Sequence, residues 1–531
     1  MKKNSMNTQV AVLLGLLAIF AIAGCGGGKS LDNVAAPTDN NAGLTFTEPA
    51  LVEHTAAQIG VADTTFILTF FGGTNIKTSG ATYVGGAACT ACHATTADTF
   101  ATTNHATAAA RKASTFAASS TCMNCHTVNG PQTPVWASGK ATRTNVNNGA
   151  FGLVAVDYSK TATSTALILA AAANPTYGGI QCENCHGPAS LHIAGGGDKN
   201  FIVTGSQAVA VSTCDVCHDS PTHHSKSQSW RMSGKIDPAT GLMSGGHAAS
   251  LHTGKTCSAC HTAEGFIAFT ARKAANPAVY AFDGIGGVTD TVGQHNINCS
   301  ACHDPHKTTP GNPQLRIAAE ELCITCHKAG STSGVRGPGT LSSGTYRAPH
   351  HNIQGRVLAG EYGMTADDKM YITSSTDPIL SATYTVATKQ VTTTSTSFIG
   401  PSMGETTCVN CHMYVDATVD RSHSFAPNPK ACEGCHAGIN GEAIIGKKQA
   451  DYIANYTPAK ARLDLATTAY YDSVAKAYRA GVFTDAQKIL YADAKWNLEL
   501  VDYDGSKGVH NTAYIMKLID NASAMLTQLG Y

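Results

Sequence analysis

The sequence is poor in the side chains that usually fill a protein core or form a charged binding surface. Only 7% of its 531 residues are aromatic and 14% are charged, while glycine occurs 52 times. Lys plus Arg and Asp plus Glu balance at 36 each, so no basic field indicates nucleic acid and no acidic excess is present. A chain of this length therefore forms several domains, or one domain filled by something other than side chains.

Long apolar runs are also absent, apart from one at the N-terminus. Lys2 and Lys3 precede an apolar run of 14 residues, 10–23, which suits a signal peptide and is short for a membrane-spanning helix. Residues 22–25, Ile-Ala-Gly-Cys, resemble the lipobox of bacterial lipoproteins, with an ordinary signal peptide as the alternative. We expect a lipoprotein-type signal peptide over 1–24, a lipidated Cys25 and a flexible, polar tether over 25–50.

Cysteine and histidine are abundant instead, at 19 and 22 residues. Every cysteine except Cys25 belongs to one of nine copies of the pattern Cys-x-x-Cys-His. The repeat cysteines are Cys89, Cys92, Cys122, Cys125, Cys182, Cys185, Cys214, Cys217, Cys257, Cys260, Cys299, Cys302, Cys323, Cys326, Cys408, Cys411, Cys432 and Cys435. The histidines that follow them are His93, His126, His186, His218, His261, His303, His327, His412 and His436.

This repeat is typical of covalent c-type haem attachment. Two thiols three positions apart can each add to one of the two vinyl groups of a porphyrin, and the next residue, His, reaches the iron as its proximal axial ligand. Disulfides in an oxidising compartment are one alternative, and zinc bound by paired Cys-x-x-Cys units is another. An odd number of copies and the constant trailing His favour haem, so the sequence predicts nine covalently attached haem c groups.

Thirteen further histidines exceed the nine distal ligands that nine irons need. This surplus predicts mostly bis-histidine irons, which have low potentials and six filled coordination positions. His306 lies too close to His303 to share its iron, so we expect it to serve a neighbouring haem. The distal candidates are His105, which falls on a predicted helix, His192, His224, His247, His252, His306, His351, His423 and His510, with His223, His295 and His350 as alternates.

The expected fold is a multihaem cytochrome c fold, packed around haem, with loops, short helices and few strands over the nine-haem domain, 51–440. One strand is predicted at 64–73, and the alternating, Thr-rich segment 382–398 predicts a hairpin. Because haems replace the missing aromatic core, the haem-free chain should be largely unfolded.

Residues 441–531 differ in character and predict a helical C-terminal segment that supplies the distal ligand His510. Helix-start signals at Thr457-Pro458 and at Thr484 support this. The predicted helices run from Pro458 to Gly481, from Thr484 to about Val501, and from Asn511 to Leu529 with Tyr514, Leu518 and Met525 on one side.

Several phrases around the repeats are similar to those of the multihaem c-type cytochromes exported by metal-respiring bacteria. They are CENCHGPASLH (182–192), CHTAEGF (260–266), CSACHDPH (299–306) and APHH (348–351). GVHNTAYIMKLI (508–519) resembles the C-terminal distal-histidine helix of pentahaem nitrite reductases and octahaem hydroxylamine-oxidising relatives. Those reductases hold their catalytic haem through a CxxCK variant, which this sequence lacks. Nitrite reduction is therefore not favoured.

The resemblance implies an electron carrier rather than a substrate-specific enzyme, with no catalytic residue of its own. It would be an outer-membrane lipoprotein on the periplasmic or cell-surface face. Electrons would pass from periplasmic donors to extracellular acceptors. The implied partners are other c-type cytochromes, porin-type conduits of the outer membrane or metal oxides, but not nucleic acid. Two alternatives stay open: an oxidoreductase that acts on a small nitrogen or sulfur oxyanion at one open haem, and an electron-storage protein.

Overall fold

The structure is a computed structural model. Its main described segments are 84–111, 179–209, 211–218, 257–276, 295–307, 314–328, 348–367, 408–415, 422–434, 438–474 and 483–531. Shorter described pieces are 126, 133–137, 140–144, 226–231, 233, 247, 369–372, 390–393, 436, 477–479 and 481. The predicted signal peptide, Cys25, the tether and the predicted strand at 64–73 lie outside these residues.

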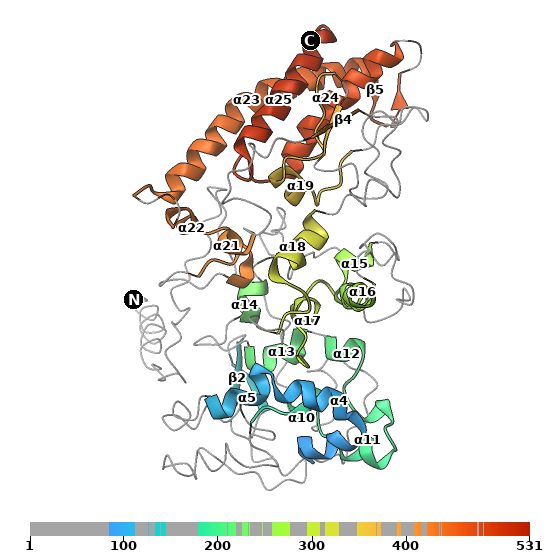
Figure 1. The fold of residues 1–531 in the computed structure, drawn as a ribbon, viewed down its shortest axis with the longest axis vertical. Helices are drawn as coiled ribbons and strands as arrows, with labels where there is room; N and C mark the ends of the chain where they lie inside the picture. Colours follow the sequence, from blue (N-terminus) through green and yellow to red (C-terminus); the bar gives the residue numbers. More distant parts are fainter. Residues whose placement is uncertain are drawn as a thin grey trace, which may run out of the picture.

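Short helices joined by loops form the part of the chain that carries the repeats (Figure 1). Those described before the third repeat include α4 (Thr90–Ala101) and α5 (Asn104–Arg111). The next group is α10 (Cys182–His186), α11 (Ser190–Ala194), α12 (Ser206–Val209), α13 (Val211–His218) and α14 (Lys226–Arg231). The last group is α15 (Ser258–His261), α16 (Ala263–Ala275), α17 (Cys299–Cys302), α18 (Ala319–His327), α19 (Gln354–Leu358), α21 (Cys408–His412) and α22 (Lys430–Glu433). The predicted multihaem fold class of short helices, loops and few strands is confirmed.

Strands within the described residues form three two-stranded pairs. β1 (Thr133–Ala137) and β2 (Lys140–Thr144) are antiparallel, as are β5 (Tyr471–Asp472) and β6 (Ala477–Tyr478). β3 (Lys369–Ile372) pairs with β4 (Gln390–Thr393) in parallel. The hairpin predicted over 382–398 is therefore wrong for its described residues, because β4 pairs with an upstream strand and not with its own neighbour.

A three-helix bundle occupies the opposite end of the molecule from α4, α10 and α11 (Figure 1). It consists of α23 (Gly441–Tyr470), α24 (Asp485–Tyr503) and α25 (Thr512–Gln528). Thr484 and Gln487 form a capping box at the start of α24, and the Asn511 side chain accepts a hydrogen bond from the Tyr514 N–H at the start of α25. The last two predicted helices are confirmed.

The first predicted helix of this segment is wrong at both ends. α23 begins after Asn440, whose side chain accepts from the Ala443 N–H, and it ends at Tyr470. Pro458 lies inside the helix and does not start it. Packing explains the difference, because Tyr452 and Leu463, on either side of Pro458, are buried in the bundle core.

Side-chain packing is concentrated in this bundle. Its core combines the buried side chains of α23, α24 and α25 with a few from α19 and the loop that follows it. Tyr514, Leu518 and Met525 are all buried there, as their shared face predicted. The second described cluster, around Phe266 and Phe269 on α16, is small. The described part of the repeat-bearing region therefore has little apolar core of its own.

Candidate haem sites

Each described repeat places its thiols on a helical turn. Residues at i, i+3 and i+4 of a helix share one face, so the two cysteines and the histidine of Cys-x-x-Cys-His project to the same side. α10 shows how local sequence fixes this turn. Gln181 and Asn184 form a capping box at its start, and Gly187, with φ of 78°, ends it directly after His186.

The described thiols do not support the disulfide or zinc alternatives. None of the fifteen described repeat cysteines forms a disulfide, although both cysteines of seven repeats are described. Among the described residues, the single group of three or more potential metal ligands within 4.8 Å of one another contains His261, His350 and His351 and no cysteine. Burial raises the pKa of the Cys185 and Cys302 thiols to about 12. These thiols are therefore not thiolate nucleophiles at neutral pH.

Seven repeat histidines each face a second imidazole from elsewhere in the chain. The ring centres are 5.7–6.4 Å apart in every pair. Two metal–nitrogen bonds of about 2.0 Å, each continued by about 1.1 Å to a ring centre, separate two trans imidazoles on one iron by about 6.2 Å. The pairs are His93–His192, His218–His105, His186–His306, His327–His247, His261–His351, His303–His423 and His412–His510.

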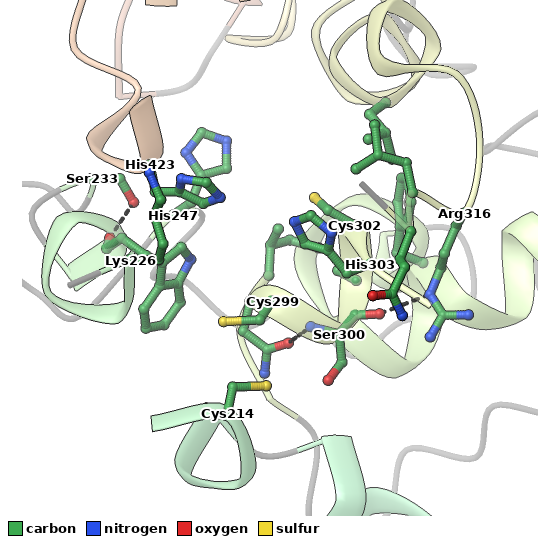
Figure 2. Close-up of a pocket in the computed structure, with 18 of the residues that line it drawn as sticks. Cys214, Lys226, Ser233, His247, Cys299, Ser300, Cys302, His303, Arg316 and His423 are labelled. Atoms are coloured by element: carbon green, nitrogen blue, oxygen red, sulfur yellow. Dashed lines mark hydrogen bonds between the residues drawn. The ribbon is translucent and has the colours of Figure 1, made fainter. Parts of the chain in front are cut away.

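The run CSACHDPH illustrates the arrangement. His303 faces His423, with ring centres 6.2 Å apart, and the two side chains stand at one pocket (Figure 2). His306 faces His186 instead, at 5.9 Å. The two histidines of this run thus belong to different pairs. His105 lies on α5, a helix as predicted.

His350 and His351 both lie near His261. The His351 ring centre is 6.1 Å from that of His261 and 4.2 Å from that of His350. His351 is exposed, whereas His350 is half-buried and its Nδ1 is 2.8 Å from Asn352 Oδ1. Since both rings are within reach of one iron, the geometry keeps His350 as the alternate ligand.

Hydrogen bonds at Nδ1 fix the orientation of many of the paired rings. The acceptors are Val203 O for His186 (2.6 Å), Asp198 O for His192 (3.0 Å), Gln354 Oε1 for His327 (2.9 Å), Phe425 O for His412 (2.7 Å) and Asp504 Oδ1 for His510 (2.6 Å). An Nδ1–H that donates to such an acceptor leaves Nε2 unprotonated, which is the atom that binds a metal.

Burial also prepares these imidazoles to act as neutral ligands. It lowers the pKa of His105, His186, His306, His327 and His412, and it lowers the pKa of His247 to about 4. For His510, burial acts in the same direction, but the charge and hydrogen bond of Asp504 outweigh it and raise the pKa. Asp504 is therefore the one carboxylate among the Nδ1 hydrogen-bond acceptors named above, whereas the other acceptors are neutral oxygens.

A single cavity connects all seven pairs. Its volume is about 3610 Å³, whereas a pocket for one small molecule has about 300–1,000 Å³. All fourteen paired histidines line it, together with cysteines from eight of the nine repeats. Residues whose chemistry suits a porphyrin thus surround one continuous space that protein side chains leave open.

The structure does not bring every candidate residue to this cavity. His295 lies 2.7 Å from Glu264 through its Nδ1, and its ring pairs with no described repeat histidine. His436 is exposed, and no described imidazole faces it. Cys122, Cys125, Cys435, His223, His224 and His252 lie outside the described residues.

Several supporting residues were not predicted from the sequence. Glu183, inside the third repeat, is buried and accepts hydrogen bonds from the backbone of Val84, Gly85 and Ala189. Asn352 donates to the Cys326 carbonyl at 2.6 Å. A carboxylate or amide directly beside a repeat is a weak sequence signal for a residue that supports a haem site. Nothing in the sequence indicates that Asp504 orients His510.

Comparisons with known proteins agree with this chemistry. A family model described as a doubled CXXCH motif matches residues 292–332. The multihaem cytochrome MtrA of Shewanella baltica (strain OS185) is 28% identical over 162 residues, which are 28% of this chain and 42% of the relative. The chain thus spans less than half the length of the curated relative it matches.

Two solved structures are similar to that of this chain. An undecahaem cytochrome from the S-layer of Carboxydothermus ferrireducens gives a TM-score of 0.46 at 20% identity, over 85% of this chain and 70% of that one. The outer cell wall cytochrome OcwA gives 0.43 at 18% identity, over 84% and 99%. Within the described residues, no helix is long and apolar enough to cross a membrane.

The repeats, the family match and the multihaem relative identify the chain as a multihaem c-type cytochrome. The Cys-x-x-Cys-His motifs and this relative support covalently bound c-type haem. When bound, haem supplies the redox-active iron, and the chain supplies the thiols, the imidazoles and the enclosing cavity.

Proposed function

We propose that the protein conducts electrons through nine covalently bound, low-potential haems with mostly bis-histidine iron. The seven imidazole pairs around one cavity carry this proposal. Each pair has the separation that one six-coordinate iron requires, and no described wall divides the cavity between them. Filled coordination positions favour electron transfer over substrate binding.

Contacts between the repeats give an order for the first sites. The Cys89 side chain lies next to that of Cys182, which supports neighbouring His93 and His186 sites. Cys185 interacts electrostatically with Cys217, which leads to the His218 site. Each step joins residues that attach or ligate neighbouring haems.

The path continues toward the bundle. His105, the partner of His218, interacts with His303. Cys302, from the same repeat as His303, interacts with Cys326, and His327 in turn interacts with His510. The path therefore runs along the long axis of the molecule, from α4 and α10 at one end, past α17 and α18, to α21 beside the bundle (Figure 1).

The His327 site is a branch point in this order. The Cys326 side chain lies next to that of Cys260, which belongs to the His261 site. That site lies off the main path, and its Cys257 and His351 are exposed. We infer that electrons can leave the row both at its ends and through this side branch.

No described imidazole faces His436. His224 and His252, which lie outside the described residues, remain as distal candidates. The exposed His436 side chain is the one observation that favours the second candidate function, the reduction of a small nitrogen or sulfur oxyanion, because an open iron there would face solvent.

The location follows from the N-terminal signal and remains part of the proposal. Lipidation at Cys25 and a polar tether would hold the cytochrome at the outer membrane. It would there receive electrons from periplasmic cytochromes or a porin-type conduit and pass them to metal oxides or partner cytochromes outside the cell. In the alternative role of electron storage, the same haems would hold electrons without exchanging them rapidly with external acceptors.

Electron paramagnetic resonance of the purified, oxidised protein tests the proposal. Entirely low-spin ferric haem, together with rapid electron exchange with an external acceptor, is the expected result. A high-spin fraction that changes on addition of nitrite or sulfite would support the reductase instead, and reduction without fast exchange would support storage.

A further inference from the structure

We infer that Arg316, with its partner Asp304, is a fixed charge pair that sets the reduction potentials of the two adjacent haems, those of the His303–His423 and His186–His306 pairs. This inference rests on the proposed function, since it concerns the haems that those pairs would hold. No iron ligand is involved, and the proposal depends on where a permanent cation lies relative to the cavity.

Arg316 is held tightly against the turn that carries Cys299 and Cys302. Its backbone N–H donates to the Cys302 carbonyl at 2.9 Å, and its Nε donates to the Ser300 carbonyl at 2.8 Å (Figure 2). Only 15% of its side chain is exposed, and it lines the cavity. The guanidinium is thus fixed at the wall of the His303 site.

Asp304 is paired with this cation and is not among the residues that line the cavity. Its carboxylate is 3.4 Å from Arg316 and 3.8 Å from both His306 and Lys307. The Lys307 side chain is half exposed, so its charge is screened by water. Among the described charges of this cluster, the largely buried Arg316 cation is therefore the one that faces the haem space.

Hydrogen bonds hold the segment 314–316, which carries Arg316, in place. Gln314, at φ of 57°, donates through its side chain to the Pro305 carbonyl, and its own carbonyl accepts from the Asp304 N–H at 2.7 Å. Leu315 forms a β-bridge with His303. These bonds hold the segment 303–306, which carries the proposed proximal ligand His303 and the proposed distal ligand His306.

A fixed cation beside a haem stabilises the reduced iron, which carries one positive charge fewer. Burial lowers the pKa of Arg316, but an arginine stays charged in a protein, so its effect does not depend on pH. Asp304 acts in the opposite direction and limits the rise. The pair would thus adjust the driving force for electron transfer between these two haems and their neighbours.

The test is a redox titration of the full-length holoprotein carrying single substitutions. Arg316→Gln should lower the potentials of two haems, with a change of about tenfold in the equilibrium constant of electron exchange with their neighbours, equivalent to about 59 mV for one electron. Asp304→Asn should raise the same two potentials. The variants His306→Met and His423→Met show which waves of the titration belong to these two haems, because a thioether ligand raises the potential of the haem that carries it.

Three controls separate charge from structure. Arg316→Lys keeps the charge and should stay close to the parent protein, the double variant Arg316→Gln/Asp304→Asn should fall between the single variants, and Lys307→Gln should change little. Equal shifts for Arg316→Gln and Arg316→Lys, or shifts of the same sign for Arg316→Gln and Asp304→Asn, would overturn the inference. A normal haem content with unmoved potentials would do so too, whereas an absence of haem would refute the proposed function itself.

Discussion

Replacing Asp504 with Asn should raise the potential of the haem held by His412 and His510. Asp504 is buried and lies 2.6 Å from His510 Nδ1, so its charge acts on the iron through the ring. Adding the ring and a metal–nitrogen bond of about 2 Å places the carboxylate about 7 Å from the iron. At an effective dielectric constant of about 20, one charge at that distance contributes about 2.4 kcal/mol, or on the order of 100 mV for one electron.

The assay is a spectroscopic redox titration of Asp504→Asn beside the parent protein. Asparagine retains an acceptor oxygen for His510, so the ring should keep its orientation and the iron should remain low-spin. Asp502→Asn is the matched control, because Asp502 is exposed and its loss should shift the titration little. An unchanged or lowered potential in Asp504→Asn with normal haem content would refute the assignment of His510 as an iron ligand.

Three further predictions concern the supports of the haem sites. Glu183→Gln replaces a carboxylate that accepts hydrogen bonds from three backbone N–H groups with an amide that has one acceptor oxygen. Each lost bond should cost about 1–3 kcal/mol, so limited proteolysis near Val84 should become faster. The control is the exposed Glu442→Gln, and a Glu183→Gln digestion pattern no different from that of the control would contradict the prediction. Arg356→Ala removes a buried cation paired with the buried Glu361 carboxylate and should lower the free energy of unfolding by about 3–5 kcal/mol in denaturant titrations followed by circular dichroism. The exposed Lys447→Ala should change it by less than about 1 kcal/mol, and equal effects would argue against a buried ion pair. The haem-free chain should retain helical circular dichroism from α23, α24 and α25 alone, and a native-like spectrum would show that haem is not part of the core.

Local chemistry explains which features were predictable from the sequence. The Cys-x-x-Cys-His spacing is a property of a single helical turn, so it identifies haem attachment without a fold. Thr484 and Asn511 begin α24 and α25 with side chains that cap the first turn. Such signals depend on residues three or four positions apart, and the structure has them where the sequence predicted them.

Features that depend on tertiary packing were harder to predict. Pro458 is a strong helix-start signal by local rules, but α23 continues through it because the bundle buries side chains on both sides. The segment 382–398 alternates like a hairpin, yet its described strand pairs with residues 369–372. In both cases a distant partner, which local sequence does not reveal, decided the outcome.

The candidate ligands divide in the same way. The histidine count predicted an ample supply of distal ligands, and seven of the nine preferred candidates face repeat histidines in the structure. Which histidine faces which was not predictable, because His306 and His186, or His510 and His412, meet only in the folded chain. The acceptors that orient them, such as Gln354 and Asp504, belong to residue types that occur throughout the sequence.

The intact mass of the full chain, matured in a host that attaches haem c, tests the central claim most directly. The account predicts the mass of the processed polypeptide plus nine covalently bound haems, together with a strong Soret band. A mass that corresponds to fewer haems would contradict the nine-site assignment. A polypeptide without added haem would contradict the account as a whole.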